Sequence, residues 1–249
     1  YRHWQDSPAT LKQSTDRAFC EGINRLMVHT ITATRPGDGK PGYEYYAGTH
    51  LNPNITWGEK AGDFFSYISR CQYMLREGQF VADVLFYNGD WAPNIVEPKH
   101  INPSLGKGYD YDVCNEEIIL TRLSVKDGLL MLPDGMTYRM LVLPDSTNMP
   151  AGTLKKIASL VADGATVVGR PPQRDPGLKN YPECDREVQS IASEVWGKID
   201  GVNTCSASYG KGRVFFGKDL RSILLEDGIQ PDFETDSDDA HIDFIHRTT

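Results

Sequence analysis

Hydrophobic residues recur along this chain with two periods, one typical of helices and the other of short buried strands. The clearest helical pattern covers residues 59–77, where apolar side chains return at intervals of three and four positions. Patterns of the same kind predict further helices over 8–22, 114–123, 151–163, 184–196 and 219–226. Compact apolar runs predict strands over 23–29, 80–87, 129–132, 138–143, 165–168 and 212–216, and another beginning within 242–247. The fold class is therefore expected to be α/β.

Capping and turn residues support these boundaries. Ser7-Pro8 is typical of a helix start, and Gly78 and Gly164 follow the ends of predicted helices. The strand, helix and strand within 138–168 have the lengths of a parallel crossover. Two long loops, 30–58 and 88–111, interrupt the pattern, and loops of this length in a compact region are usually functional or disordered.

Composition narrows the classes of partner. The net charge of −8 disfavours binding to nucleic acid or to anionic lipid, whereas neutral ligands such as sugars are unaffected. Apolar runs are only a few residues long, so no membrane span is predicted. The five cysteines are widely spaced and form no CxxC pair, which disfavours a zinc site or a disulfide framework. Because the chain starts at Tyr1 without a signal peptide, it is interpreted as an internal piece of a longer protein.

Several segments occur in an order that is typical of one enzyme family. They are DRAFCEGINRLMVHT, GTHLNPNITW, FFSYISRCQYMLREGQFVADVLFYNGD, GYDYDVCNEEIIL and KDGLLMLPDGMTYRMLVLP, followed by LVADGATVVG. Together they resemble glycoside hydrolase family 106, the α-L-rhamnosidases, over nearly all 249 residues. The resemblance implies cleavage of terminal α-L-rhamnosyl residues from plant or bacterial glycans by carboxylates with inversion, with a calcium ion (Ca2+) at the active site.

The resemblance also implies a domain organisation. Residues 1–78 would be the late part of a (β/α)8 catalytic barrel, and 79–228 an open flavodoxin-like or amidotransferase-like α/β domain. Residues 229–249 would begin a truncated β domain. The substrate would be a rhamnose-containing oligosaccharide or polysaccharide, and the full-length protein would be periplasmic or secreted. Two positions depart from the family pattern: Gly58 stands where a second Trp is expected, and Pro53 replaces a loop Arg.

Glu21 is the leading candidate for chemistry. It lies in CEGINR, at the end of a predicted helix and beside a glycine turn that lets a carboxylate approach a ligand. Glycoside hydrolysis needs one carboxyl to protonate the leaving oxygen and another to activate water. The second carboxylate is expected upstream of Tyr1. The alternative for Glu21 is a solvated residue at a helix end.

Polar residues on or just after the predicted strand 23–29 are candidates for substrate binding. His29 and Thr30 close this strand, and in a barrel the carboxyl ends of strands face the active site. Asn24 and Arg25 lie nearer the strand start, where structural hydrogen bonding is the competing interpretation.

The loop motif GTHLNPNITW supplies a second group of candidates. His50, Asn52 and Asn54 offer polar groups for sugar hydroxyls, and Trp57 offers an aromatic face for the apolar side of a 6-deoxy sugar. The alternative is that this motif staples the long loop onto the barrel.

Carboxylates elsewhere are weaker candidates. Asp90 and Asp110, with Asp112, are possible oxygen ligands for calcium, although their motifs also form turns and lack EF-hand spacing. No glycine-rich phosphate loop is present, and Cys114 is not in a nucleophile elbow.

Three functions remain open. The first is an inverting rhamnosidase, of which this piece alone would be inactive. The second is a non-catalytic carbohydrate-binding or scaffolding relative, and the third is another barrel glycosidase such as a β-galactosidase relative.

Overall fold

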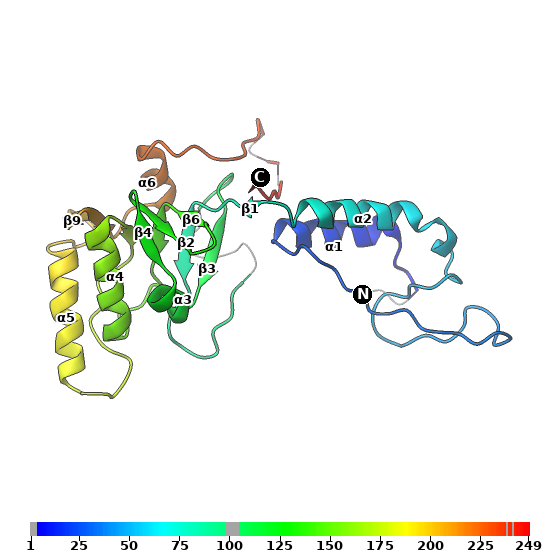
Figure 1. Cartoon of the computed structure of the whole chain (residues 1–249), viewed down its shortest axis with the longest axis horizontal. Coiled ribbons are helices and arrows are strands. Elements are labelled where there is room, and N and C mark those ends of the chain that lie inside the picture. Colours follow the sequence, from blue (N-terminus) through cyan, green and yellow to red (C-terminus); the bar gives the residue numbers. More distant parts are fainter. Residues whose placement is uncertain (1–3, 98–104, 238, 241) are drawn as a thin grey trace. The chain divides into compact units, whose positions relative to one another are not determined.

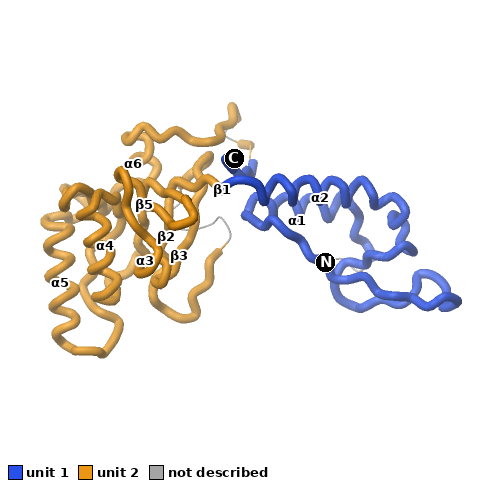
Figure 2. Tube along the Cα trace, viewed as in Figure 1, with its two compact units in different colours: residues 1–79, 241–249 blue, residues 80–240 orange. Residues whose placement is uncertain are grey.

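A computed structural model describes residues 4–97, 105–237, 239–240 and 242–249. The chain divides into two compact units, which Figure 2 colours separately. Unit 1 consists of residues 1–79 and 241–249, and unit 2 of residues 80–240. The fold is mixed α/β, as the sequence predicted.

Unit 1 is built on two helices that lie side by side, α1 (Pro8–Cys20) and α2 (Gly62–Met74) (Figure 1). The Thr10 hydroxyl accepts a hydrogen bond from the Ser7 backbone N–H at 2.9 Å, which helps to cap α1. A short 3-10 helix, η1 (Gly58–Lys60), precedes α2, and β11 (Arg247–Thr248) pairs with β1 (Gln79–Phe80). The hydrophobic cluster of this unit is small, and its buried members among the described residues are Phe19, Ile68 and Leu75.

The strand predicted over 23–29 is wrong. This segment is not a strand, and its apolar side chains Ile23, Met27 and Val28 are exposed. A strand needs a neighbour for its backbone groups, and no described strand pairs with this segment. Only its end is paired, through Thr49 N–H to the His29 carbonyl at 2.9 Å and Thr30 N–H to the Thr49 carbonyl at 3.1 Å.

Unit 2 contains a six-stranded sheet in the order β3-β2-β7-β8-β10-β9. All neighbouring strands are parallel except β9 and β10. The strands are β2 (Val84–Tyr87), β3 (Tyr111–Cys114), β7 (Met140–Val142), β8 (Thr166–Val168), β9 (Ser206–Tyr209) and β10 (Gly212–Phe215). A separate antiparallel sheet consists of β4 (Ser124–Lys126), β5 (Leu129–Met131) and β6 (Thr137–Tyr138).

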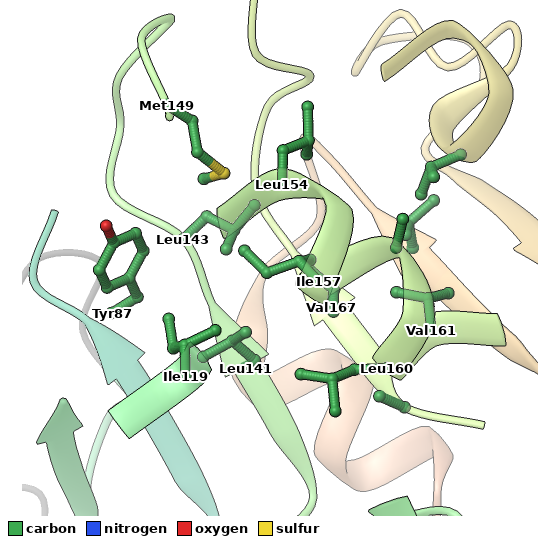
Figure 3. Packing of buried hydrophobic residues seen from close by; sticks show 14 of the residues in the cluster. Tyr87, Ile119, Leu141, Leu143, Met149, Leu154, Ile157, Leu160, Val161 and Val167 are labelled. Atoms are coloured by element: carbon green, nitrogen blue, oxygen red, sulfur yellow. The ribbon is translucent and has the colours of Figure 1, made fainter. Parts of the chain in front are cut away.

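Alternation along the central strands creates a core on each face of the large sheet. Leu85 and Tyr87 of β2 join the larger core with α3 (Glu116–Thr121), α4 (Ala151–Asp163) and α5 (Glu183–Trp196). Figure 3 shows how α4 residues such as Leu154 and Ile157 pack against this face. Val84 and Phe86 join the second core with α6 (Leu220–Glu226).

Most predicted elements of unit 2 are present, but several strands differ. Strand β3 lies where a loop was predicted to end, so the helix predicted from residue 114 begins only at Glu116. Strands β4 and β9 were not predicted. In unit 1, the strand predicted to begin within 242–247 is short and comprises Arg247–Thr248. Within the described residues, no helix combines the length and the apolar character needed to cross a membrane.

Candidate functional site

A pocket of about 170 Å³ in unit 1 brings together three of the candidates from the loop motif. His50, Asn54 and Trp57 line it, as do Trp4 and Asp6 from the segment before α1. The remaining lining residues come from the same long loop: Pro41, Ile55 and Thr56. The loop 30–58 therefore folds back on the start of the chain and encloses a concave surface with two indole rings.

Hydrogen bonds and ring contacts hold the walls of this pocket. The Trp57 indole N–H donates to the Asp6 carbonyl at 2.9 Å, and the Thr49 hydroxyl donates to the Asp6 carboxylate at 3.3 Å. The ring centroids of Trp4 and His50 are 4.3 Å apart, with an angle of 34° between the planes. Asn54 is held by its backbone N–H, which donates to Asn52 Oδ1 at 2.7 Å. Trp57 is thus held by a hydrogen bond, and Trp4 by its ring contact with His50.

Behind the pocket wall lies a buried carboxylate that the sequence did not single out. Glu44 Oε2 is 3.0 Å from His50 Nδ1, and the two side chains are only 7% and 3% exposed. The Asn52 amide donates to the other Glu44 oxygen. This pairing favours a proton on Nδ1 of His50, so that Nε2 is the ring nitrogen on the side away from Glu44. In the sequence Glu44 lies between tyrosines, in GYEYYAG. No spacing pattern connects it to His50, so the sequence did not indicate this pair.

His29 and Thr30 do not line the pocket. They pair through their backbones with Thr49, next to His50, and the His29 ring makes an edge contact with Tyr45 at 5.4 Å between centroids. Their observed contacts fix the base of the long loop.

Glu21, Asn24 and Arg25 lie outside the pocket as well. Glu21 is the C-cap of α1, where its carboxylate is 3.7 Å from the Arg17 guanidinium and its side chain is 18% exposed. Asn24 and Arg25 are exposed in the extended segment after the helix. The structure therefore does not bring Glu21 together with the residues of the loop motif.

The two calcium candidates lie at opposite ends of the neighbouring parallel strands β2 and β3. Asp90 follows the carboxyl end of β2, whereas Asp110 precedes β3, which runs parallel to β2. Each strand is four residues long, so its two ends are roughly 13 Å apart. Asp110 is buried and accepts a hydrogen bond from the Tyr111 backbone N–H at 3.0 Å. These two carboxylates cannot bind the same ion.

Asp90 and Asp112 both hold their protons more tightly than a free aspartate does. Partial burial raises the pKa of Asp90 to about 6, and the charges of Glu116 and Asp175 add to this effect. Burial likewise raises the pKa of Asp112, against a hydrogen bond of 2.8 Å from the Tyr138 hydroxyl. Among the described residues, no group of three or more His, Cys, Asp or Glu side chains is placed to hold a metal ion. Asp90, Asp110 and Asp112 are therefore not brought together as ligands of one ion.

Comparison with known proteins agrees with the motifs. A protein of Formosa agariphila with the name "Putative beta-glucuronidase" is 37% identical over 249 residues, which are 99% of this chain and 20% of that protein. The structure of a rhamnosidase from Novosphingobium sp. PP1Y has a TM-score of 0.81 at 30% identity, over 99% of this chain and 23% of that one. The chain thus spans about a fifth of the length of the curated relative.

The family assignment rests on the whole length of the chain. The sequence profile of the alpha-L-rhamnosidases matches residues 1–249. The rhamnosidase structure covers the same residues of both units. The chain therefore belongs to glycoside hydrolase family 106, the alpha-L-rhamnosidases.

Proposed function

We propose that the whole protein hydrolyses terminal α-L-rhamnosyl residues of oligosaccharides or polysaccharides, with inversion, and that the pocket of unit 1 binds part of the sugar. The observation that carries this proposal is the pocket itself, in which Trp4, Trp57 and His50 form the walls. Aromatic faces bind the C–H surfaces of sugars, and a few polar groups set their orientation. At about 170 Å³ the pocket is smaller than a typical complete ligand site, so other parts of the protein would complete it.

The charges in the pocket favour a neutral sugar over a uronic acid. No Lys or Arg lines it among the described residues, and Asp6 adds a carboxylate. A glucuronic acid carboxylate would meet no cationic partner here and would face like charge. The charges of the pocket therefore support a rhamnoside as substrate rather than the glucuronide that the name of the Formosa relative suggests.

We also propose finer fold assignments. The exposed apolar segment 23–31 supports the placement of residues 1–78 in a (β/α)8 barrel, where neighbouring strands would cover it. In unit 2 the parallel strands follow the order second, first, third, fourth and fifth along the chain. This order supports a flavodoxin-like α/β domain for residues 79–228. A periplasmic or secreted location of the full-length protein belongs to the same proposal.

The proposed mechanism needs two carboxyl groups on opposite sides of the scissile bond. Glu21 is the proposed proton donor, although it lies outside the pocket, and its partner carboxyl would come from another part of the whole protein. His50, held by Glu44, and Asn54 orient the sugar hydroxyls against Trp57. A calcium ion in the whole protein would be held by residues outside this chain.

The test is the hydrolysis of an aryl α-L-rhamnoside by the full-length protein and by its Glu21→Gln variant. We expect the variant to lose at least about a hundredfold in kcat, because general acid or base catalysis contributes that much. Glu59→Gln is the matched control, since Glu59 is exposed and does not line the pocket. Near-normal turnover by a folded Glu21→Gln variant would remove Glu21 from the mechanism.

The same assay separates the alternative functions. A non-catalytic carbohydrate-binding relative would bind L-rhamnose without hydrolysing any aryl glycoside. Another barrel glycosidase would prefer an aryl galactoside or glucuronide. Either result would overturn the proposed substrate while leaving the family assignment intact.

A further inference from the structure

A second cavity lies in unit 2, beside the carboxyl ends of β2 and β3. Its volume is about 410 Å³, which is within the usual range for small-molecule sites. Asn88 follows β2, Asn115 follows β3, and Asn94 lies in the loop between them. In open parallel sheets ligands bind outside the carboxyl ends of the strands, near the point where the strand order reverses. Here the order reverses between β2 and β7, and the cavity lies on the neighbouring side of β2, by the ends of β2 and β3.

Hydrogen bonds hold the three asparagine side chains of this cavity, and two of their polar atoms are left for a ligand. Asn94 Nδ2 donates to the carbonyls of Asn88 and Gly89, at 3.1 and 3.0 Å, and its oxygen accepts from Asn88 Nδ2. Asn115 Oδ1 accepts from the Ile118 backbone N–H at 3.1 Å. With the residues that the structure describes, Asn88 Oδ1 and Asn115 Nδ2 make no hydrogen bond. The cavity therefore offers one acceptor and one donor group.

The other lining residues define the chemistry of the ligand. Val96, Val113 and Ile118 give an apolar surface, and no charged side chain lines the cavity among the described residues. Asp90 and Glu116 lie two and one positions from the lining asparagines, so the neighbourhood is acidic and disfavours phosphates and carboxylates. Burial raises the pKa of the Cys114 thiol to about 12, so it stays protonated and is a poor nucleophile. These features suit binding of a neutral molecule without covalent chemistry.

We infer that this cavity is a sugar-binding site of unit 2, separate from the pocket of unit 1. A vicinal pair of hydroxyl groups can donate to Asn88 Oδ1 and accept from Asn115 Nδ2, while the C–H face of the ring packs on the valines. The choice of L-rhamnose as ligand rests on the proposed function, but binding at this cavity is measured without hydrolysis, so the two can fail separately. The inference assigns unit 2 a role in holding a neutral glycan.

The experiment titrates the 15N-labelled chain with L-rhamnose and follows the side-chain amide resonances of Asn88 and Asn115. We expect both to shift, and D-glucuronate to bind several-fold more weakly because of the acidic neighbourhood. Asn115→Asp keeps the helix cap but replaces the donor by an acceptor, and should weaken L-rhamnose binding about tenfold or more. Asn148→Asp is the matched control, since its side chain is exposed and does not line the cavity.

A second pair of variants covers the case in which Asn115→Asp disturbs the fold. Val96→Trp should fill the cavity and abolish the shifts, whereas Val202→Trp, at an exposed position elsewhere in unit 2, should leave them unchanged. The inference fails if saturating L-rhamnose shifts only the Trp57 indole resonance of unit 1. It also fails if D-glucuronate binds as tightly as L-rhamnose, or if both cavity variants bind like their controls.

Discussion

Glu44 is a carboxylate withdrawn from water between His50 and Asn52, and it connects the outer part of the long loop to the pocket. Replacing it with Gln keeps its shape, but one carboxylate oxygen becomes an amide N–H2. That group then faces either His50 or Asn52, which are both donors, and cannot accept a hydrogen bond from it. A buried polar group left without a partner costs about 1–3 kcal/mol. We therefore expect Glu44→Gln to loosen residues 30–58 and to speed their cleavage by a protease in the full chain.

The same variant has a functional consequence in the full-length enzyme. Loss of the His50 orientation should raise KM for an aryl rhamnoside more than it lowers kcat, because Glu44 does not itself line the pocket. Glu59→Gln, which changes an exposed side chain, serves as the control. Unchanged proteolysis together with unchanged KM would show that the buried pair has no role in positioning.

Asp90 predicts a pH dependence of stability in unit 2. Its pKa is raised to about 6, so the folded state holds its proton more tightly than the unfolded chain does. Stability from this group is complete below about pH 4 and is lost as the pH rises toward 6. Asp90→Asn should therefore raise the Tm at pH 7.5 and change it little at pH 4. Asp236→Asn, at an exposed site, is the control, and an equal gain at both pH values would contradict the argument.

Among the residues of the pocket, the sequence predicted those of one loop motif. His50, Asn54 and Trp57 stand within a single motif, so their proximity follows from spacing along one loop. Trp4, Asp6 and Glu44 come from segments whose approach depends on how the loop folds back, and no local pattern records that path. Whether Glu21 transfers a proton remains a prediction.

Among the elements, those with buried surfaces on one stripe were the most predictable. Helix α4 forms over Ala151–Asp163 as predicted, because its apolar stripe and Gly164 mark both its face and its end. Strands β3 and β9 were missed because they lie at the two edges of the sheet and carry polar residues in short runs. A hydrophobic pattern arises where side chains are buried, and edge strands bury few of theirs.

The segment 23–29 gives a prediction at the same scale. Met27 is 93% exposed in this chain, so Met27→Lys should change its stability by no more than about 0.5 kcal/mol. In the full-length protein the proposed barrel would bury Met27, and the same change should destabilise by at least about 2 kcal/mol. Urea unfolding of both proteins measures the difference, with Leu178→Lys as the exposed control. Equal effects in both would contradict the barrel placement.

For the whole chain, the two units differ greatly in the size of their cores. Unit 2 buries two large apolar clusters on the faces of its sheet, whereas unit 1 has three buried residues in its cluster. Limited proteolysis should therefore leave a resistant fragment within residues 80–240, identified by mass spectrometry. A resistant fragment from residues 1–79 instead would contradict this ranking.

The whole-chain comparison also predicts the activity of the isolated piece. The 249 residues should not hydrolyse an aryl rhamnoside, because the second carboxylate of the proposed mechanism lies outside them. Appreciable turnover by the isolated chain would contradict both the mechanism and the barrel placement.

The pairing of β1 with β11 brings the chain that leads into unit 2 beside a segment that follows unit 2. Arg247 donates to the carbonyls of Glu77 and Gly78 at 2.8 and 2.6 Å, so the chain returns to unit 1 next to the place where it left. A short glycine linker from Phe80 to Arg247 is therefore long enough to close unit 1 without stretching its backbone. Unit 2, together with the segment that follows it, could be excised or exchanged between relatives by cutting the chain beside the β1 and β11 pair.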